Sequence, residues 1–98
     1  MSNQSIPKEQ IPFLLWSKDE VLHNPDQQKS RKDQLQKAQQ HNRMFYSKAK
    51  IVFESTEGIK EVSANIWEVT DNHVMLKGGI NIPVKSILEV LLESENAS

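Results

Sequence analysis

The stretch GGINIPVKSILEV, residues 78–90, decides how the second half of this chain folds. Two glycines permit a tight turn, and the apolar strand after them runs into Pro83, which has no amide hydrogen to donate to a neighbouring strand. Pairing must therefore end at Pro83, or the strand must lie at a sheet edge. We expect VKS to form a brief 3₁₀ turn, so that ILEVLL leaves at a sharp angle and pairs with a different strand. The pattern is typical of a corner in a small β-barrel.

Upstream of this corner the apolar residues recur with the period of two that is typical of strands. KAKIVFEST alternates, TEG supplies a turn, and IKEVSANIWEVT reads as a long second strand. Its apolar face changes between Ala64 and Trp67, which predicts a bend or bulge there. After the turn residues DN, HVMLK forms a third strand with Val74 and Leu76 facing inward. Residues 47–93 are thus predicted to form a small five-stranded antiparallel barrel.

Residues 25–46 carry the signals of a helix. Asn24 is a good N-cap, Pro25 takes the first helical position, and the segment is rich in Gln, Lys and Arg, which favour helices. Its apolar content is thin, so we expect a half-exposed helix resting on a narrow face. The residues on that face are Leu35, Ala38 and Phe45, completed by Gln28, Arg31 and Asn42.

Residues 1–24 are predicted to form an N-terminal apolar arm and a short capped helix. The arm is IPFLLW, residues 11–16, and the helix follows from Ser17 and Glu20, which have the spacing of a capping box. A polar tail occupies residues 94–98. The expected fold class is therefore α+β, with N-terminal helices followed by a small five-stranded antiparallel SH3-like or Sm-like β-barrel, all in one folded domain.

Composition narrows the classes of function. The net charge is −1, so no global attraction to nucleic acid or to a membrane follows, and the absence of cysteine excludes disulfides and thiolate metal sites. The apolar arm is too short to span a bilayer or to act as a signal-peptide core. We therefore expect a cytoplasmic protein that makes no use of a membrane.

The near-zero net charge conceals a basic segment in the middle of the chain. Residues 29–50 hold seven basic residues against one acidic residue, whereas residues 51–98 hold eight acidic residues against three basic ones. The basic residues are candidates for neutralising phosphates, with Phe45 or Tyr46 available to stack on a base. The alternative is a solvated helix face that complements the acidic barrel. The candidate nucleic-acid-binding residues are Lys29, Arg31, Lys32, Lys37, Arg43, Lys48 and Lys50.

The apolar arm is a second candidate site, because five large apolar side chains in six residues need cover. It either covers the chain's own barrel, which we favour because so short a barrel lacks core, or it binds a protein partner or a second copy of the chain. The candidate partner-binding residues are Ile11, Phe13, Leu14, Leu15 and Trp16.

No arrangement of residues points to catalysis. No nucleophile motif, phosphate-binding glycine loop or His-Glu-x-x-His motif is present, and KGG at residues 77–79 is a turn. His23, His41 and His73 lack the spacing of metal ligands. We therefore predict a non-enzymatic protein with no catalytic residues, no metal, no cofactor and no identifiable small-molecule substrate.

The layout of residues 25–92, a helix and then bent strands ending in INIPVKSILEV, resembles the small SH3-like barrels and among them the Sm-like proteins. Asp71–Asn72 matches part of one Sm-like RNA-binding signature, and Lys77–Gly78 matches part of the other. The resemblance implies a five-stranded barrel, assembly into homo-oligomeric rings, and RNA as a ligand.

Two functions follow as expectations. The first is a protein-interaction or self-assembly module built on a small β-barrel. The alternative is binding of RNA or another single-stranded nucleic acid through the basic helix. A loss of nucleic-acid binding on reversing the charge of Lys29 and Arg31 separates the second function from the first.

Overall fold

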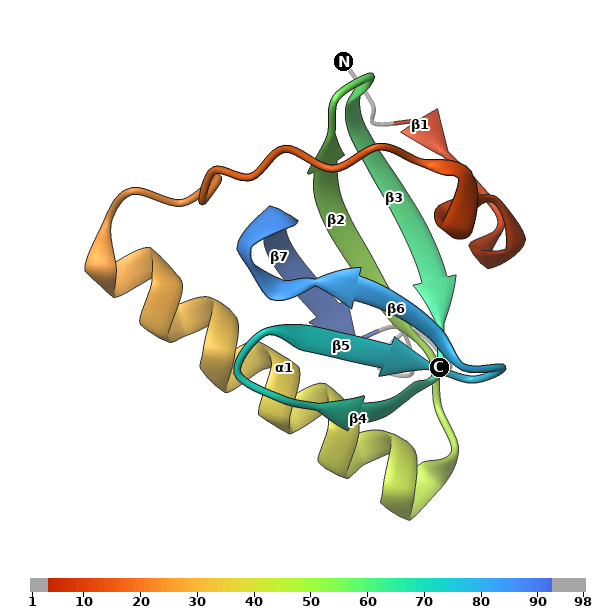
Figure 1. The fold of residues 1–98 in the computed structure, drawn as a ribbon. Helices are drawn as coiled ribbons and strands as arrows, with labels where there is room; N and C mark the ends of the chain where they lie inside the picture. The colour runs from red at the N-terminus through yellow and green to blue at the C-terminus, as the bar shows by residue number, and fades with distance from the viewer. Residues whose placement is uncertain (1–3, 93–98) are drawn as a thin grey trace.

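The computed structural model describes residues 4–92, which form a mixed α+β fold (Figure 1). The capped polar segment before residue 48 forms a helix. The segment after it, in which apolar side chains recur at a period of two, forms strands. In chain order the elements are β1 (Gln4–Ser5), the 3₁₀ helix η1 (Lys8–Phe13), α1 (Pro25–Phe45), β2 (Ala49–Ser55), β3 (Gly58–Ala64), β4 (Ile66–Val69), β5 (His73–Leu76), β6 (Ile80–Pro83), the 3₁₀ helix η2 (Val84–Ser86) and β7 (Ile87–Leu92).

The strands form two sheets. One has the order β1-β3-β2-β7 and the other the order β4-β5-β6, with every pair antiparallel except β1 and β3. Val74 and Leu76, which the sequence places inward, are buried. The core lies between the sheets and α1 and contains Leu35, Ile51, Phe53, Val62, Ile66, Ile82, Ile87 and Val90 as well.

The chain passes from one sheet to the other at Asn65. The predicted bend is confirmed, because β3 ends at Ala64, β4 begins at Ile66, and the pairing of β4 with β5 shifts register between Ile66 and Glu68. What the sequence suggested as one long strand is therefore two strands in different sheets. The closed five-stranded barrel is not confirmed, since the strands lie in two separate sheets.

The corner predicted at Pro83 is confirmed. Gly78 and Gly79 adopt positive φ angles of 97° and 82° in the turn before β6, a conformation that side chains rarely permit. β6 ends at Pro83, the 3₁₀ turn η2 follows, and β7 pairs with β2 instead of β6. Proline at the end of β6 leaves no amide hydrogen without a partner.

Helix α1 begins and ends close to the predicted bounds. The Asn24 side chain accepts a hydrogen bond of 2.8 Å from the amide of Asp26, as an N-cap does, and Pro25 follows it. The helix ends at Phe45, with Tyr46 in the left-handed conformation. The placement of Phe45 on the buried face was wrong. Phe45 is the last helical residue, and its side chain is 62% exposed.

Polar side chains attach α1 to the free edges of both sheets. On β4, Gln39 Nε2 and Asn42 Nδ2 donate to the carbonyl oxygens of Trp67 and Ile66, at 3.3 and 3.2 Å. The helix makes two matching bonds to β7: Arg31 Nη1 donates to the Ile87 carbonyl at 3.0 Å, and the Val90 amide donates to Gln34 Oε1 at 2.9 Å. Unpaired strand edges are thereby covered, which explains how a helix with so little apolar surface stays on the body.

The short capped helix predicted after Ser17 is absent, and residues 14–24 form an irregular strap between η1 and α1. Ser17 Oγ accepts from the Asp19 amide at 3.2 Å instead of capping a helix. Glu20 accepts from the Leu22 amide at 3.0 Å and from the Arg31 guanidinium. A guanidinium is a stronger partner for this carboxylate than the amide of a marginal helix, so tertiary pairing prevails over the local motif.

The strap ends at residue 24, and α1 spans Pro25–Phe45. The polar tail, residues 94–98, lies outside the described residues. Within residues 4–92, no helix is long and apolar enough to cross a bilayer.

Candidate functional site

Of the predicted phosphate-binding cations, Arg31 lies inside the molecule. It is 6% exposed, and its Nη1 and Nη2 atoms donate to the two carboxylate oxygens of Glu20 at 2.7 and 2.8 Å. The hydrogen bonds from Arg31 lower the pKa of Glu20, with smaller contributions from the Leu22 amide and from the charge of the guanidinium. Arg31 thus holds the strap to α1 and does not present its charge to an external phosphate.

The other predicted cations divide by position. Lys50 is half-buried on β2, where its Nζ lies 3.5 Å from Glu61 Oε2, so its charge is matched within the sheet. At 100° per residue, the exposed helix cations all fall outside the arc of α1 that holds the buried residues. The exposed cations are Lys29, Lys32, Lys37 and Arg43 on α1 and Lys48 just beyond it.

Three aromatic residues with exposed rings lie at the end of α1 and on β4 beside it. Phe45 and Tyr46 are each 62% exposed, and Trp67 on β4 is 45% exposed. Lys77, in the turn after β5, donates to the Tyr46 hydroxyl, and its Nζ lies 4.9 Å from the centre of that ring. We call these three rings and the cations near them, in sequence or in space, the aromatic surface. Its residues are Arg43, Phe45, Tyr46, Lys48, Trp67 and Lys77.

Two buried asparagines hold the aromatic surface together. Asn65 Nδ2 donates to Asn42 Oδ1 at 2.8 Å and to the carbonyl oxygens of Tyr46 and Ser47 at 3.4 and 3.1 Å. The carbonyl oxygen of Asn65 accepts from the Lys77 amide at 2.9 Å. One residue therefore ties the end of the helix to the β3–β4 junction and to the turn after β5. Such fixed backbone holds side chains in position with little loss of entropy on binding.

Sequence reasoning located the bend between Ala64 and Trp67 but assigned no role to Asn65 and did not predict that Trp67 is exposed. Asn is depleted in strands, so its occurrence in the apolar run SANIW was a signal that the strand breaks there. The break changes which residues point outward, leaving Ile66 buried and Trp67 exposed.

The apolar arm is divided between burial and exposure. Ile11 is 1% exposed, Leu14 packs against the core, and the Trp16 ring lies 5.4 Å from the ring of Phe53. Phe13 and Leu15, by contrast, are 84% and 69% exposed.

Backbone hydrogen bonds fix the arm in this arrangement. The Leu14 amide donates to the Ile11 carbonyl, and the Thr56 amide donates to the Leu15 carbonyl, both at 3.0 Å. Figure 1 shows this part of the chain crossing the β2–β3 ribbon. The arm therefore covers its own body with one set of side chains and displays the other.

The residues that carried the resemblance do not meet in one site. Asp71–Asn72 lies in the turn before β5, and Lys77–Gly78 lies in the turn after it. A strand of this length separates them by about 13 Å at 3.3 Å per residue. They are thus at opposite ends of β5.

The histidines are also apart. His23 and His73 are exposed, and His41 contacts the Ser47 hydroxyl at 2.9 Å and the Phe45 ring at 4.8 Å. Among residues 4–92, no group of three His, Asp or Glu side chains is arranged to hold a metal ion.

Comparison of the chain with protein-family models, with curated proteins and with solved structures finds no match. Its function therefore has to be inferred from its own residues.

Proposed function

We propose that this chain is a small non-enzymatic binding protein whose ligand is single-stranded nucleic acid, RNA above all. The observation that carries the proposal is the aromatic surface: two exposed rings, Phe45 and Tyr46, stand at the end of a helix whose outer face carries four cations, and a third, Trp67, lies on β4 beside that helix. Proteins that bind single strands combine a basic track for the backbone with rings on which bases stack. The rings are available to a ligand because they are exposed, and the asparagine network holds them in place.

The proposed path of the strand follows α1. Phosphates lie along the exposed cations Lys29, Lys32, Lys37, Arg43 and Lys48, and bases stack on Phe45, Tyr46 and Trp67. The overall charge of −1 does not oppose RNA binding. Salt screens charges that are more than about 10 Å apart, so a phosphate responds mainly to the cations close to it. Glu54 and Glu57 lie at the far end of β2 from Lys48, whereas Asp33 on α1 and Glu68 next to Trp67 are acidic residues on the path itself.

The test is fluorescence anisotropy of a labelled single-stranded RNA, titrated with protein at about 50 and 200 mM salt. Replacing Arg43 and Lys48 with Gln should weaken binding and reduce the slope of log affinity against log salt by about 0.7 for each phosphate that is no longer neutralised. Trp67→Ala should cost about 1–3 kcal/mol of binding free energy with little change in slope.

Lys18→Gln is the matched control, because Lys18 is an exposed cation on the strap, outside α1. It should leave both affinity and slope close to those of the wild type. Absence of binding at the lower salt, or equal weakening by all three variants, would contradict the proposal.

A second function, self-assembly through the arm, is favoured by the exposure of Phe13 and Leu15 on a fixed backbone. Apolar side chains displayed in this way are typical of protein interfaces. Sedimentation velocity over a range of concentrations tests it: self-association should be lost on replacing both residues with Ser. A single monomeric species at every concentration would rule it out.

The small-barrel architecture and its likeness to SH3-like and Sm-like proteins also remain proposals. The path of the chain supports them. Each strand is next to the following one, either in a sheet or along the chain, in the order β7, β2, β3, β4, β5 and β6, and η2 connects β6 back to β7. Amide hydrogen exchange of β6 and β7 tests closure, since a strand paired on both sides is protected along its whole length.

A further inference from the structure

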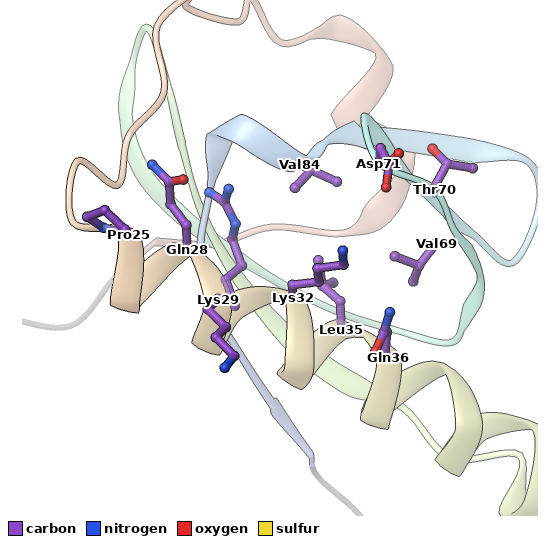
Figure 2. A pocket seen from close by; sticks show the side chains of 11 residues that line it. Pro25, Gln28, Lys29, Lys32, Leu35, Gln36, Val69, Thr70, Asp71 and Val84 are labelled. Carbon is purple, nitrogen blue, oxygen red and sulfur yellow. The ribbon is translucent and has the colours of Figure 1, made fainter.

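A groove separates the N-terminal half of α1 from the turn after β4 and the corner after β6 (Figure 2). Its volume is about 410 Å³, which lies within the range of small-molecule sites. Leu35 of α1, Val69 at the end of β4 and Val84 of η2 supply apolar side chains from three elements. The groove is separate from the aromatic surface, and none of the rings described above lines it.

Opposite charges face each other across this groove. Lys32 rises from α1 on one wall, and Asp71 with Thr70 forms the other, whereas Lys29 turns away (Figure 2). Within residues 4–92, neither Lys32 nor Asp71 has an ion-pair partner, and the described salt bridges are Arg31–Glu20 and Lys50–Glu61. A cation and an anion left unpaired across an apolar floor match a ligand that bears both charges.

A third polar group at this groove lacks a partner. Arg31 lines it, and although the two Nη atoms of Arg31 are bonded, its Nε–H donates to no atom of the described residues. The Arg31 side chain is almost wholly buried, and a buried donor without an acceptor is costly. Because this nitrogen is buried beneath the wall of the groove, it offers no contact to a ligand, and recognition of both charges rests on Lys32 and Asp71.

We propose that the groove binds a small zwitterion of the amino-acid type with an apolar side chain. The ligand carboxylate pairs with Lys32, its ammonium group pairs with Asp71, and its side chain lies over Leu35, Val69 and Val84. The interaction is reversible binding and involves no covalent step. Charge-assisted hydrogen bonds at both ends provide specificity, and the apolar floor provides most of the contact area.

Three probes test this: L-phenylalanine, 3-phenylpropionate, which lacks the ammonium group, and phenethylamine, which lacks the carboxylate. Each is titrated into ¹⁵N-labelled protein to about 10 mM, enough to saturate a millimolar site. L-phenylalanine should shift the amide signals of Val69, Thr70 and Asp71. Each of the other two probes should bind about tenfold more weakly, because one charged end is left unpaired.

Two variants assign the ends of the ligand. Lys32→Gln should weaken the binding of L-phenylalanine about tenfold and leave the binding of phenethylamine unchanged. Asp71→Asn should also weaken the binding of L-phenylalanine about tenfold, but should leave the binding of 3-phenylpropionate unchanged. Lys18→Gln is the control, because Lys18 is an exposed cation on the strap that does not line the groove, and it should leave the binding of all three probes unchanged.

Two outcomes would overturn the proposal: no shift of the groove signals at the highest concentration, or equal binding of all three probes. Equal binding would mean that contact with the apolar floor alone holds the probe. Both altered side chains are on the surface, so the amide spectrum of each variant should otherwise match that of the wild type. Lys32 belongs to the proposed phosphate track as well as to the groove, so the distinguishing variant is Asp71→Asn, which should weaken L-phenylalanine and leave RNA binding unaffected.

Discussion

Helix α1 and the N-terminal arm are attached to the same body by opposite means. The helix, which is mostly polar, is anchored by Arg31, Gln34, Gln39 and Asn42, whose side chains bond to backbone atoms at the sheet edges. The apolar arm is anchored by Ile11, Leu14 and Trp16, which pack against the core.

The comparison shows that residue polarity and burial diverge in both regions. Arg31 and Asn42 are buried although they are polar, because each meets a backbone carbonyl that would otherwise lack a partner. Phe13 and Leu15 are exposed although they are apolar, while Ile11, Leu14 and Trp16 of the same segment pack against the core. In the arm, buried and exposed side chains thus alternate along one short segment.

The largest expected effect is at the arm. Ile11→Ala should lower the free energy of unfolding by about 2–5 kcal/mol, because it removes a fully buried side chain and leaves a cavity. Phe13→Ala, two residues away, should change it by no more than about 0.5 kcal/mol. Urea unfolding followed by circular dichroism measures both. Similar losses for the two variants would mean that the arm is not divided as described.

A smaller effect is expected at the helix end. Asn65→Ala should cost about 1–3 kcal/mol, because Asn42 and two carbonyl groups lose a buried donor. Asn72→Ala, at an exposed turn, is the matched control and should cost about 0.5 kcal/mol or less. If Asn65→Ala proved as mild as the control, polar anchoring would not be what holds this end of α1.

The smallest effect concerns the strap and depends on pH. Because the pKa of Glu20 is lowered in the folded state, its pairing with Arg31 stabilises the fold above the unfolded pKa and is lost as the pH falls through the folded one. Glu20→Gln should therefore cost about 1 kcal/mol or less near pH 7, since the pair is partly exposed.

The difference between wild type and Glu20→Gln should stay constant down to about pH 5 and shrink below about pH 4.3. Urea unfolding at several pH values measures it. A difference that grew on acidification would have the wrong sign and would contradict the assigned role of the pair.

The elements of the fold could be predicted where the signal is local. Asn24 and Pro25 mark the start of α1, and Gly78, Gly79 and Pro83 determine the turn and the corner, because backbone conformation at these residues depends on their own chemistry. The division of the strands between two sheets could not be predicted, since it depends on which strands pair across long distances.

The candidate site was harder to predict for the same reason. Arg31 bonds to a carbonyl 56 residues away, and Asn65 bonds to Asn42 across 23 residues, so neither role is visible in the neighbouring sequence. The basic residues were recognised as a group, but the sequence alone did not show that Arg31 and Lys50 have internal partners. The exposure of Trp67 follows only from the break at Asn65.

The most direct test of the central claim, that bases stack at the end of α1, uses the emission of Trp67. Trp16→Phe leaves Trp67 as the single tryptophan and keeps an aromatic ring against Phe53. Titration with unlabelled single-stranded RNA at about 50 mM salt should quench Trp67 fluorescence to saturation, in step with the anisotropy of a labelled strand. Binding with no change in Trp67 emission, or no binding at all, would contradict the account.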